Sequence, residues 1–197
     1  MDDYNFFALI SRMRYISRWG LMRNSLPENI QEHSHMVAVL AHALGVIRRD
    51  VFGQPCDVNA LSTAALYHDA SEILTGDLPT PIKYHNREIM AAYHEVEHLA
   101  VRKLLGMLPP ELQGAYREAL TEDKDSELYP LVKAADKLSA YIKCIEERKA
   151  GNNEFLSAEQ QTRAILEASP LPEVAYFLKN FIPAFERNLD ELGAIDQ

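Results

Sequence analysis

The sequence predicts an all-α protein of about seven or eight helices. Apolar residues recur at helical spacing through most of the 197 residues, and proline or glycine clusters separate one periodic segment from the next. We find no alternating apolar and polar run of the length that a half-buried strand would need. There is also no glycine-rich phosphate loop and no Gly-x-Ser-x-Gly elbow. The chain length favours one domain over residues 1–197.

The first three helices follow from apolar periodicity and from the residues at their ends. The first is periodic and is followed by Gly20, a plausible stop. The second carries Leu40 and Leu44 on its apolar face and follows a loop over residues 21–32. Asp57 is a good N-cap for the third. In chain order, the predicted helices cover residues 2–17, about 31–52, 58–74, 86–107, 110–121, 126–149, 154–168 and 172–191.

Loop residues separate the later helices. Gly76 suits a left-handed position after the third helix, and the prolines that follow bar its continuation. Pro110 stands at the tolerated start of a short helix, and Gly151 ends the longest one. Pro172 begins the last predicted helix.

Composition and charge exclude several classes of protein. A net charge of −9 argues against a partner that is a nucleic acid polymer, because such binders need a basic surface. Cys56 and Cys144 are too few for a disulfide scaffold and fit a reduced compartment. No signal peptide and no apolar run of membrane-spanning length are visible. We therefore expect a cytoplasmic protein without a membrane partner.

A cluster of polar residues interrupts an apolar run in the third helix. His68 and Asp69 are adjacent, and Glu72 follows one helical turn later, so we expect all three on one helix face. Burying such groups is costly unless they are paired or bound to something. One interpretation is a buried histidine hydrogen-bonded to an acid. The other is a metal site, since imidazole and carboxylate are both metal ligands.

Two further polar residues lie on apolar helix faces elsewhere in the chain. His33 shares a stripe with Leu40 and should point toward the core. Asp136 stands in the middle of the longest helix, where aspartate needs a partner. Together with His68 and Asp69 they would offer two imidazoles and two carboxylates. Such mixed ligands suit Mn²⁺, Co²⁺, Fe²⁺ or Zn²⁺, of which we favour Co²⁺ or Mn²⁺.

Other residues are weaker candidates. Arg18 and Trp19 could form an anion-binding guanidinium beside an apolar wall, or a core aromatic beside a solvated arginine. Asp77 and Thr80 could contact substrate because their loop follows Glu72, or serve ordinary turn chemistry. Of the other histidines on helices, His35 and His42 are favoured as surface or hydrogen-bonded residues. The i,i+4 spacing of His94 and His98 could bind a metal, but a charged outer face is favoured for them.

At these positions the sequence resembles the HD-domain metal-dependent phosphohydrolases, whose pattern is a His, a His-Asp pair and a distant Asp. His33, His68-Asp69 and Asp136 match in order. Nearly the whole chain is also similar to the YfbR-type bacterial 5'-deoxynucleotidases. The segments that carry this similarity are Arg18-Trp19, Glu32-His33-Ser34, His68 to Glu72, Thr75 to Pro81 and Ala150 to Phe155.

The resemblance implies an HD-domain helical bundle that hydrolyses deoxyribonucleoside 5'-monophosphates. It implies a catalytic Glu72, a catalytic Arg18 that orients the phosphate, and a homodimer. The implied metal ligands are His33, His68, Asp69 and Asp136. The implied substrate contacts are Arg18, Trp19, His33, Asp69, Asp77, Leu78, Pro79, Thr80 and Asp136.

Some alternatives stay open. Another HD phosphohydrolase would use the same metal on a nucleoside triphosphate, a pyrophosphate ester or a cyclic nucleotide. A non-catalytic nucleotide-binding protein would keep the fold but lose a ligand or Glu72, and neither is lost. A bulky Trp19 against C2' could exclude a ribose hydroxyl. The apolar stretch Val174 to Leu178 could serve a dimer, although core positions are favoured for most of it.

Overall fold

The computed structural model describes residues 4–83 and 85–193, except for the side chains of Thr80 and Pro81. In these residues the regular structure is helical, with one isolated bridge between Ser17 and Asn29. The elements are α1 (Phe6–Ile10), η1 (Ser11–Tyr15), α2 (Ile30–Val46), η2 (Ile47–Val51), α3 (Val58–Tyr67), α4 (Glu72–Thr75), α5 (Thr80–Lys83), α6 (Arg87–Leu105), α7 (Pro110–Leu120), α8 (Tyr129–Lys149), η3 (Asn153–Phe155), α9 (Leu156–Glu167), α10 (Pro172–Asn180) and α11 (Ile182–Phe185).

The predicted all-α class is confirmed. Among the described elements, seven helices have nine residues or more, and the others are single turns or short 3-10 and π segments. None of the described helices combines the length and the apolar composition that crossing a bilayer requires.

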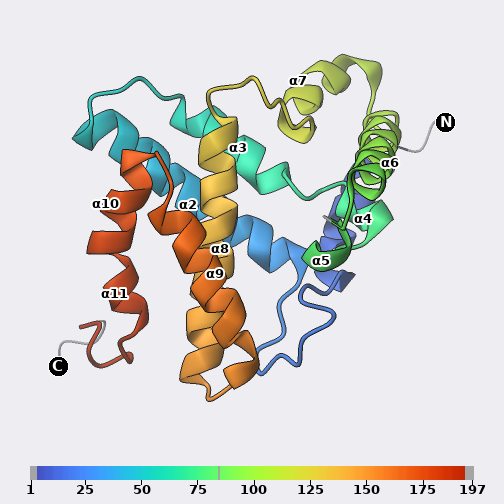
Figure 1. Cartoon of the computed structure of the whole chain (residues 1–197). Helices are drawn as coiled ribbons and strands as arrows, with labels where there is room; N and C mark the ends of the chain where they lie inside the picture. The colour runs from blue at the N-terminus through green and yellow to red at the C-terminus, as the bar shows by residue number, and fades with distance from the viewer. Residues whose placement is uncertain (1–3, 84, 194–197) are drawn as a thin grey trace.

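Helix α8 runs through the middle of the molecule (Figure 1). Helices α2 and α3 pack on it, and α9, α10 and α11 lie on one side while α4, α5 and α6 lie on the other. The main core joins these helices through buried side chains such as Leu44, Leu61, Leu138 and Ile145. Burying each such side chain contributes roughly 1.5–3 kcal/mol. The metal-ligand candidates therefore stand on α2 and α8, or in the turn directly after α3, beside the main core.

Gly45 lets α2 and α3 approach closely. A Cβ at this position would lie 3.0 Å from Leu61 Cδ2 and 3.2 Å from Val58 Cγ2, which is tighter than ordinary van der Waals contact. This close approach joins the end of α2 to the start of α3. His33 stands at the other end of α2, and His68 follows the other end of α3.

Helix α2 begins earlier than the sequence periodicity indicates. Asn29 Oδ1 accepts a bond from the backbone N–H of Glu32, and Glu32 Oε2 accepts one from the N–H of Asn29. This capping box starts the helix at Ile30, inside the predicted loop over residues 21–32. Asp57 caps α3 as predicted, by accepting a bond from the N–H of Ala60.

The predicted helix over residues 58–74 is wrong in its second half. Helix α3 ends at Tyr67, and residues 68–71 form a turn before α4 begins at Glu72. Tightened bonds from Ala70 N–H to Tyr67 O and from Glu72 N–H to Asp69 O replace the α-helical pattern. The expectation that His68, Asp69 and Glu72 share one helix face is therefore also wrong. Apolar residues continue through the turn, so periodicity does not reveal it.

The two terminal helices are also shorter than predicted. The first, expected over residues 2–17, consists of α1 and the 3-10 segment η1, and residues 2 and 3 lie outside the described part. Gly20 is not its stop, because Trp19 instead has the positive φ of 61°. The last, expected over residues 172–191, breaks at Phe181. Pro183 there lacks the N–H that a continuous helix would need, and α11 begins anew at Ile182.

Candidate metal centre

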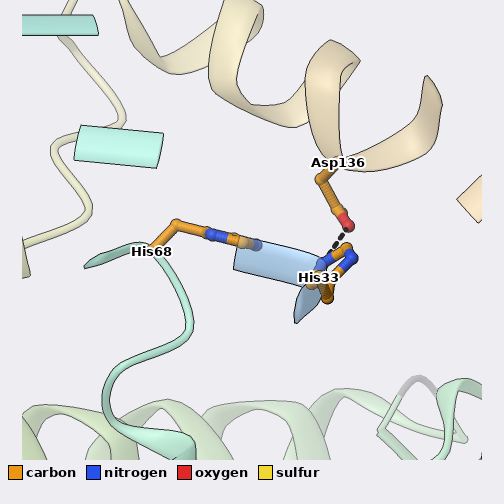
Figure 2. Close-up of side chains that lie close together, drawn as sticks. All are labelled: His33, His68 and Asp136. Carbon is orange, nitrogen blue, oxygen red and sulfur yellow. Dashed lines mark ion pairs between the residues drawn. The ribbon is translucent and has the colours of Figure 1, made fainter. Parts of the chain in front are cut away.

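Three parts of the chain bring the candidate ligands together. His33 stands on the first turn of α2, His68 follows α3, and Asp136 stands on α8. Figure 2 shows these three side chains pointing toward a common point. Each offers a ligand atom, and these atoms lie within 4.8 Å of one another. His33 is fully buried, as its place on an apolar stripe predicts.

Asp69 adds a fourth candidate ligand. Its Oδ2 lies 3.1 Å from His68 Nε2 and 3.4 Å from His33 Nε2. Asp136 Oδ1 lies 3.2 Å from the same His33 nitrogen. Two imidazoles and two carboxylates thus converge on one small volume.

Hydrogen bonds fix the orientation of both imidazole rings. His68 Nδ1 lies 2.7 Å from the carbonyl of Ala65, which can only accept, so Nδ1 carries the proton and donates it. His33 Nδ1 lies 3.2 Å from the hydroxyl of Ser139. In each ring Nε2 is therefore the atom that faces the carboxylates. Metal-binding histidines use the same arrangement, with the second nitrogen held by a carbonyl or hydroxyl.

The two Nε2 atoms provide the test of whether a cation fits. Both are buried, and neither makes a hydrogen bond within the described residues despite the nearby carboxylates. A buried nitrogen lone pair without a partner is unfavourable. A divalent cation between the two nitrogens and the two carboxylates would satisfy all four groups, so the donor set fits such an ion.

The carboxylates already have the charge that metal binding needs. Burial opposes ionisation of Asp69, but His68 and His33 outweigh it and hold the pKa of Asp69 well below its ordinary value. Burial likewise opposes ionisation of Asp136, while the nearby His33, with Nε2 3.2 Å from Asp136 Oδ1, and His68 lower the Asp136 pKa. For His33, burial and Arg18 lower the pKa, but Asp136 and Asp69 raise it overall.

Glu72 lies beside this group, but its carboxyl group is neutral where those of Asp69 and Asp136 are ionised. Its side chain is buried, and Oε2 has no hydrogen-bond partner among the described residues. Burial first, and then the charges of Asp69 and Asp77, raise the pKa of Glu72 to about 10. The carboxyl group therefore holds a proton at neutral pH beside the ionised Asp69.

Arg18 and Trp19 lie on the loop that leads to α2. Arg18 is largely buried, and its pKa is raised because Glu28, Asp69, Asp136 and Asp77 outweigh the effect of burial. Its guanidinium therefore lies within the field of the metal-centre carboxylates. The interpretation of Arg18 as a solvated surface arginine is wrong.

The loop after Glu72 lies close to Arg18 and Trp19. Burial raises the pKa of Asp77, while Arg18 and a hydrogen bond from the backbone N–H of Trp19 act against it. Gly76 has the predicted positive φ, 73°. Leu78 and Pro79 are half-buried. The side chain of Thr80 lies outside the described part of the structure.

The other histidines lie mostly as expected. His35, His42 and His98 are exposed. His94 is half-buried instead, and its Nδ1 lies 2.8 Å from Glu97 Oε2. It lines a cavity of about 550 Å³ whose wall also includes His68 and Asp69, so the expectation of an outer-face position for His94 is wrong.

Some residues near the centre had no signal in the sequence. Ser139 lies one helical turn after Asp136, on a face that reads simply as apolar core. Glu28 accepts bonds from both Arg18 and Trp19, yet it stands in a loop of ordinary composition. The i,i+3 spacing of Asp136 and Ser139 could have suggested a shared direction, but only the fold brings His33 to them.

Comparisons with known proteins find similar sequences over nearly the whole chain. The family model described as 5'-deoxynucleotidase YfbR-like matches residues 5–185. A 5'-deoxynucleotidase of Shewanella oneidensis is 48% identical over 188 residues, which cover 95% of this chain and 96% of that protein. The 5'-deoxynucleotidase YfbR of Shigella boydii is 48% identical over 194 residues, or 98% of each chain.

Solved structures show the same fold. An HD-domain phosphohydrolase of Listeria innocua superposes with a TM-score of 0.81 at 27% identity, covering 94% of this chain and 90% of that one. An HD phosphohydrolase of cyanophage S-2L, bound to dA and one catalytic Zn²⁺ ion, has a TM-score of 0.59 at 25% identity, with coverage of 93% and 96%.

Proposed function

Because the chain belongs to the YfbR-like 5'-deoxynucleotidase family, we propose that it hydrolyses deoxyribonucleoside 5'-monophosphates at the centre built from His33, His68, Asp69 and Asp136. The products are the deoxynucleoside and phosphate. The observation that carries the assignment of the centre is the pair of buried, unpartnered Nε2 atoms facing two ionised carboxylates.

The four ligand residues would hold a divalent cation. When bound, such an ion lowers the pKa of water and neutralises phosphate charge. We propose Co²⁺ or Mn²⁺, since two imidazole nitrogens and two carboxylate oxygens suit either ion. The Zn²⁺ ion of the cyanophage relative makes zinc the principal competitor.

Arg18 would orient the phosphate. A guanidinium presents several N–H donors in one plane and can give two parallel hydrogen bonds to phosphate oxygens. Its burial beside the aspartates supports this role, because a buried cation there can offset the charge of an arriving phosphate. Trp19 and the segment from Asp77 to Thr80 would hold the deoxynucleoside.

Glu72 would handle a proton. Burial and the charges of Asp69 and Asp77 raise the pKa of its carboxyl group to about 10, which supports a proton-carrying acid at neutral pH. A protonated carboxyl can donate to the leaving 5'-oxygen, whose negative charge grows as the P–O bond breaks. Its unpartnered Oε2 supports a role that is completed only when substrate is present.

We further propose that the chain acts as a cytoplasmic homodimer of single-domain subunits, without nucleic acid polymers or membranes as partners. The two free cysteines and the net charge of −9 support the location and the absence of a polymer. Ile89, Val96 and Leu99 form an exposed apolar stripe on α6 that could meet a second copy. Val174 and Phe177, by contrast, are buried in the core.

The oligomeric state is tested by light scattering of the eluted protein. A homodimer gives twice the 22.3 kDa chain mass, and Leu99→Glu should halve it if the α6 stripe forms the contact. A mass of one chain for the parent protein contradicts the dimer.

The activity is tested by phosphate release. Chelated enzyme receives Co²⁺, Mn²⁺, Mg²⁺ or Zn²⁺ and is assayed with deoxy- and ribonucleoside 5'-monophosphates, a nucleoside triphosphate and a cyclic nucleotide. We expect release from deoxyribonucleoside monophosphates, highest with Co²⁺ or Mn²⁺. The proposal fails if dAMP, dGMP and TMP are all inert while a triphosphate or cyclic ester is cleaved.

A further inference from the structure

One carboxylate oxygen holds both Arg18 and Trp19. Glu28 Oε2 accepts a bond of 2.6 Å from Arg18 Nη1 and a bond of 2.8 Å from Trp19 Nε1. The Arg18 and Glu28 side chains are 13% and 14% exposed, so water competes little for these bonds. The guanidinium and the indole therefore share a single anchor point.

The backbone around this anchor is also unusual. Trp19 has a φ of 61°, a region that costs a bulky residue about 1–3 kcal/mol. The surrounding structure must supply this energy. The backbone N–H of Arg18 donates to the carbonyl of Glu28, so Glu28 contacts the pair through its main chain as well. The indole packs against Phe155, with ring centroids 5.2 Å apart.

We propose that Glu28 is a positioning residue that sets the plane of the Arg18 guanidinium and the angle of the Trp19 indole together. The inference rests on the proposed function, in which these two groups face phosphate and deoxyribose. Through them, Glu28 controls both the rate of hydrolysis and the preference for deoxyribose over ribose.

The geometry explains why one residue can do both. A bond at Nη1 fixes the rotation of the planar guanidinium while its other N–H groups remain able to reach phosphate. A bond at Nε1 fixes the indole edge, which sets where the ring ends beside the sugar. Without Glu28, the guanidinium would be drawn toward Asp69, Asp136 and Asp77, whose charges already act on it.

Neutralisation of Arg18 and positioning of Arg18 by Glu28 predict opposite effects of Glu28→Ala. If Glu28 merely neutralised Arg18, removing its charge would strengthen the attraction for phosphate and lower KM. If Glu28 positions Arg18, kcat falls, since a misplacement of about 1 Å can cost up to about a hundredfold. We expect kcat for dAMP to fall about tenfold or more, KM to change less than kcat, and the ratio of kcat/KM for dAMP to that for AMP to fall.

The matched variants separate positioning from loosening of the loop. Glu28→Gln keeps an oxygen that can accept both bonds, so it should recover part of the rate and selectivity. Glu154→Ala is the control, because Glu154 accepts a bond from the N–H of Arg23 on the same loop without contacting Arg18 or Trp19. It should retain the parent kcat and selectivity. The metal content of every variant should equal that of the parent.

Trp19 allows two further measurements. Trp19→Phe removes the indole N–H that donates to Glu28. If Glu28 acts on selectivity through that bond, adding Glu28→Gln to Trp19→Phe should not change the dAMP to AMP ratio of kcat/KM any further. Trp19 is also the single tryptophan of the chain. Its fluorescence in Glu28→Ala should be more readily quenched by acrylamide than in the parent or in Glu154→Ala, whatever the activity.

The outcomes distinguish this inference from the proposed function. Parent-like kcat and dAMP preference in both Glu28 variants would overturn the positioning role while an active parent enzyme leaves the function intact. A parent protein inert toward every deoxyribonucleoside monophosphate would instead overturn the function. If Glu28→Ala does not fold, the kcat and selectivity of Glu28→Gln, alone and combined with Trp19→Phe, decide whether Glu28 has the positioning role.

Discussion

The residues of the candidate metal centre differ in how well their roles can be predicted from the sequence. His33, His68 and Asp136 stand out because each is polar on an apolar face, and burial of such groups needs a reason. The direction of each ring depends on Ala65 and Ser139, which are ordinary residues whose roles arise only from packing. The sequence could therefore predict which side chains come together but not what orients them.

His68→Ala and Asp69→Ala test the ligand assignment. Each removes a donor from a buried site, so both metal content and phosphate release should fall close to the background level. Elemental analysis after dialysis measures the metal, and circular dichroism checks the fold. His42→Ala is a matched control, because that histidine is exposed on α2. Full metal content in either ligand variant would contradict the assignment.

Glu72→Gln separates catalysis from metal binding. It should keep the metal and fold and lower kcat by about 10²–10⁴-fold, the usual contribution of a positioned acid or base. Unchanged turnover would rule out the proton role.

The same substitution should affect stability in a pH-dependent way. The pKa of Glu72 is about 10 in the folded metal-free protein, against an ordinary value of 4.5. Between pH 4.5 and 10 the folded protein keeps this carboxyl protonated while the unfolded chain ionises it. The free energy of unfolding of the parent therefore falls as pH rises through that range. In urea unfolding of metal-free protein, the stability of Glu72→Gln relative to the parent should therefore increase with pH across that range. An advantage that is constant with pH would contradict the raised pKa.

Trp19→Ala tests the exclusion of ribose. If the indole occupies the space that a 2'-hydroxyl needs, shortening the side chain should raise the AMP to dAMP ratio of kcat/KM. Trp19→Phe, which keeps a ring, should raise it less. A ratio equal to that of the parent in Trp19→Ala would remove Trp19 as the discriminator.

At the scale of elements, the long helices are predictable and the interruptions are not. Helices α6, α7 and α8 lie within two or three residues of their predicted bounds, since apolar periodicity dominates long segments. The turn at residues 68–71 continues the apolar pattern, and its backbone is set by tertiary packing. The local break that shapes the site is therefore the part that periodicity misses.

A buried ionic network joins the loop carrying Arg18 to α8. Lys143 Nζ contacts Glu147 Oε1 and the carbonyl of Leu26, and Asn152 Nδ2 donates to Glu147 Oε2 at 2.8 Å. Glu147 also accepts the backbone N–H groups of Ser25, at 2.9 Å, and Leu26, at 3.0 Å. The loop is thereby held to α8, the helix that also carries the candidate ligand Asp136.

Glu147→Ala should destabilise the protein by about 3–5 kcal/mol, because it leaves Lys143 buried without its partner. Urea unfolding at neutral pH measures this loss. Glu146→Ala on the exposed side of α8 is the control and should change stability little. A loss below about 1 kcal/mol in Glu147→Ala would show that the network does not hold the loop.

The network also predicts acid sensitivity. Burial opposes ionisation of Glu147, but bonds from Lys143, Asn152 and the loop N–H groups lower its pKa to about 2, from an ordinary value of 4.5. A carboxylate with a lowered pKa contributes stability above 4.5 and loses it as pH falls toward 2. The parent should therefore lose more stability over that range than Glu147→Gln does.

At the scale of the molecule, the candidate centre joins three segments that are far apart in sequence. His33, His68 and Asp136 come from α2, the turn after α3, and α8, which all share one core. The resemblance of the whole chain to a known family predicts this assembly. Composition and periodicity alone predict the helices but not which ones meet.

Removal of the metal should therefore lower the melting temperature. A cation at a hundredfold excess over its Kd adds about 2.7 kcal/mol to stability, and a chain of this size shifts by about 2–4 °C per kcal/mol. Calorimetry before and after chelation, with Co²⁺ or Mn²⁺ then restored, measures the shift. His68→Ala should show none. Equal melting temperatures for the chelated and restored parent would contradict a structural link between the ion and the three segments.

The anchor at Glu147 has a consequence for how this enzyme can vary. It binds Ser25 and Leu26 by their backbone N–H groups, while both side chains are exposed. Every amino acid except proline supplies that N–H. Mutational drift at these two positions should therefore leave the loop that carries Arg18 and Trp19 in place, so that a library of sequences varied at Ser25 and Leu26 could be made without disturbing the candidate ligand residues.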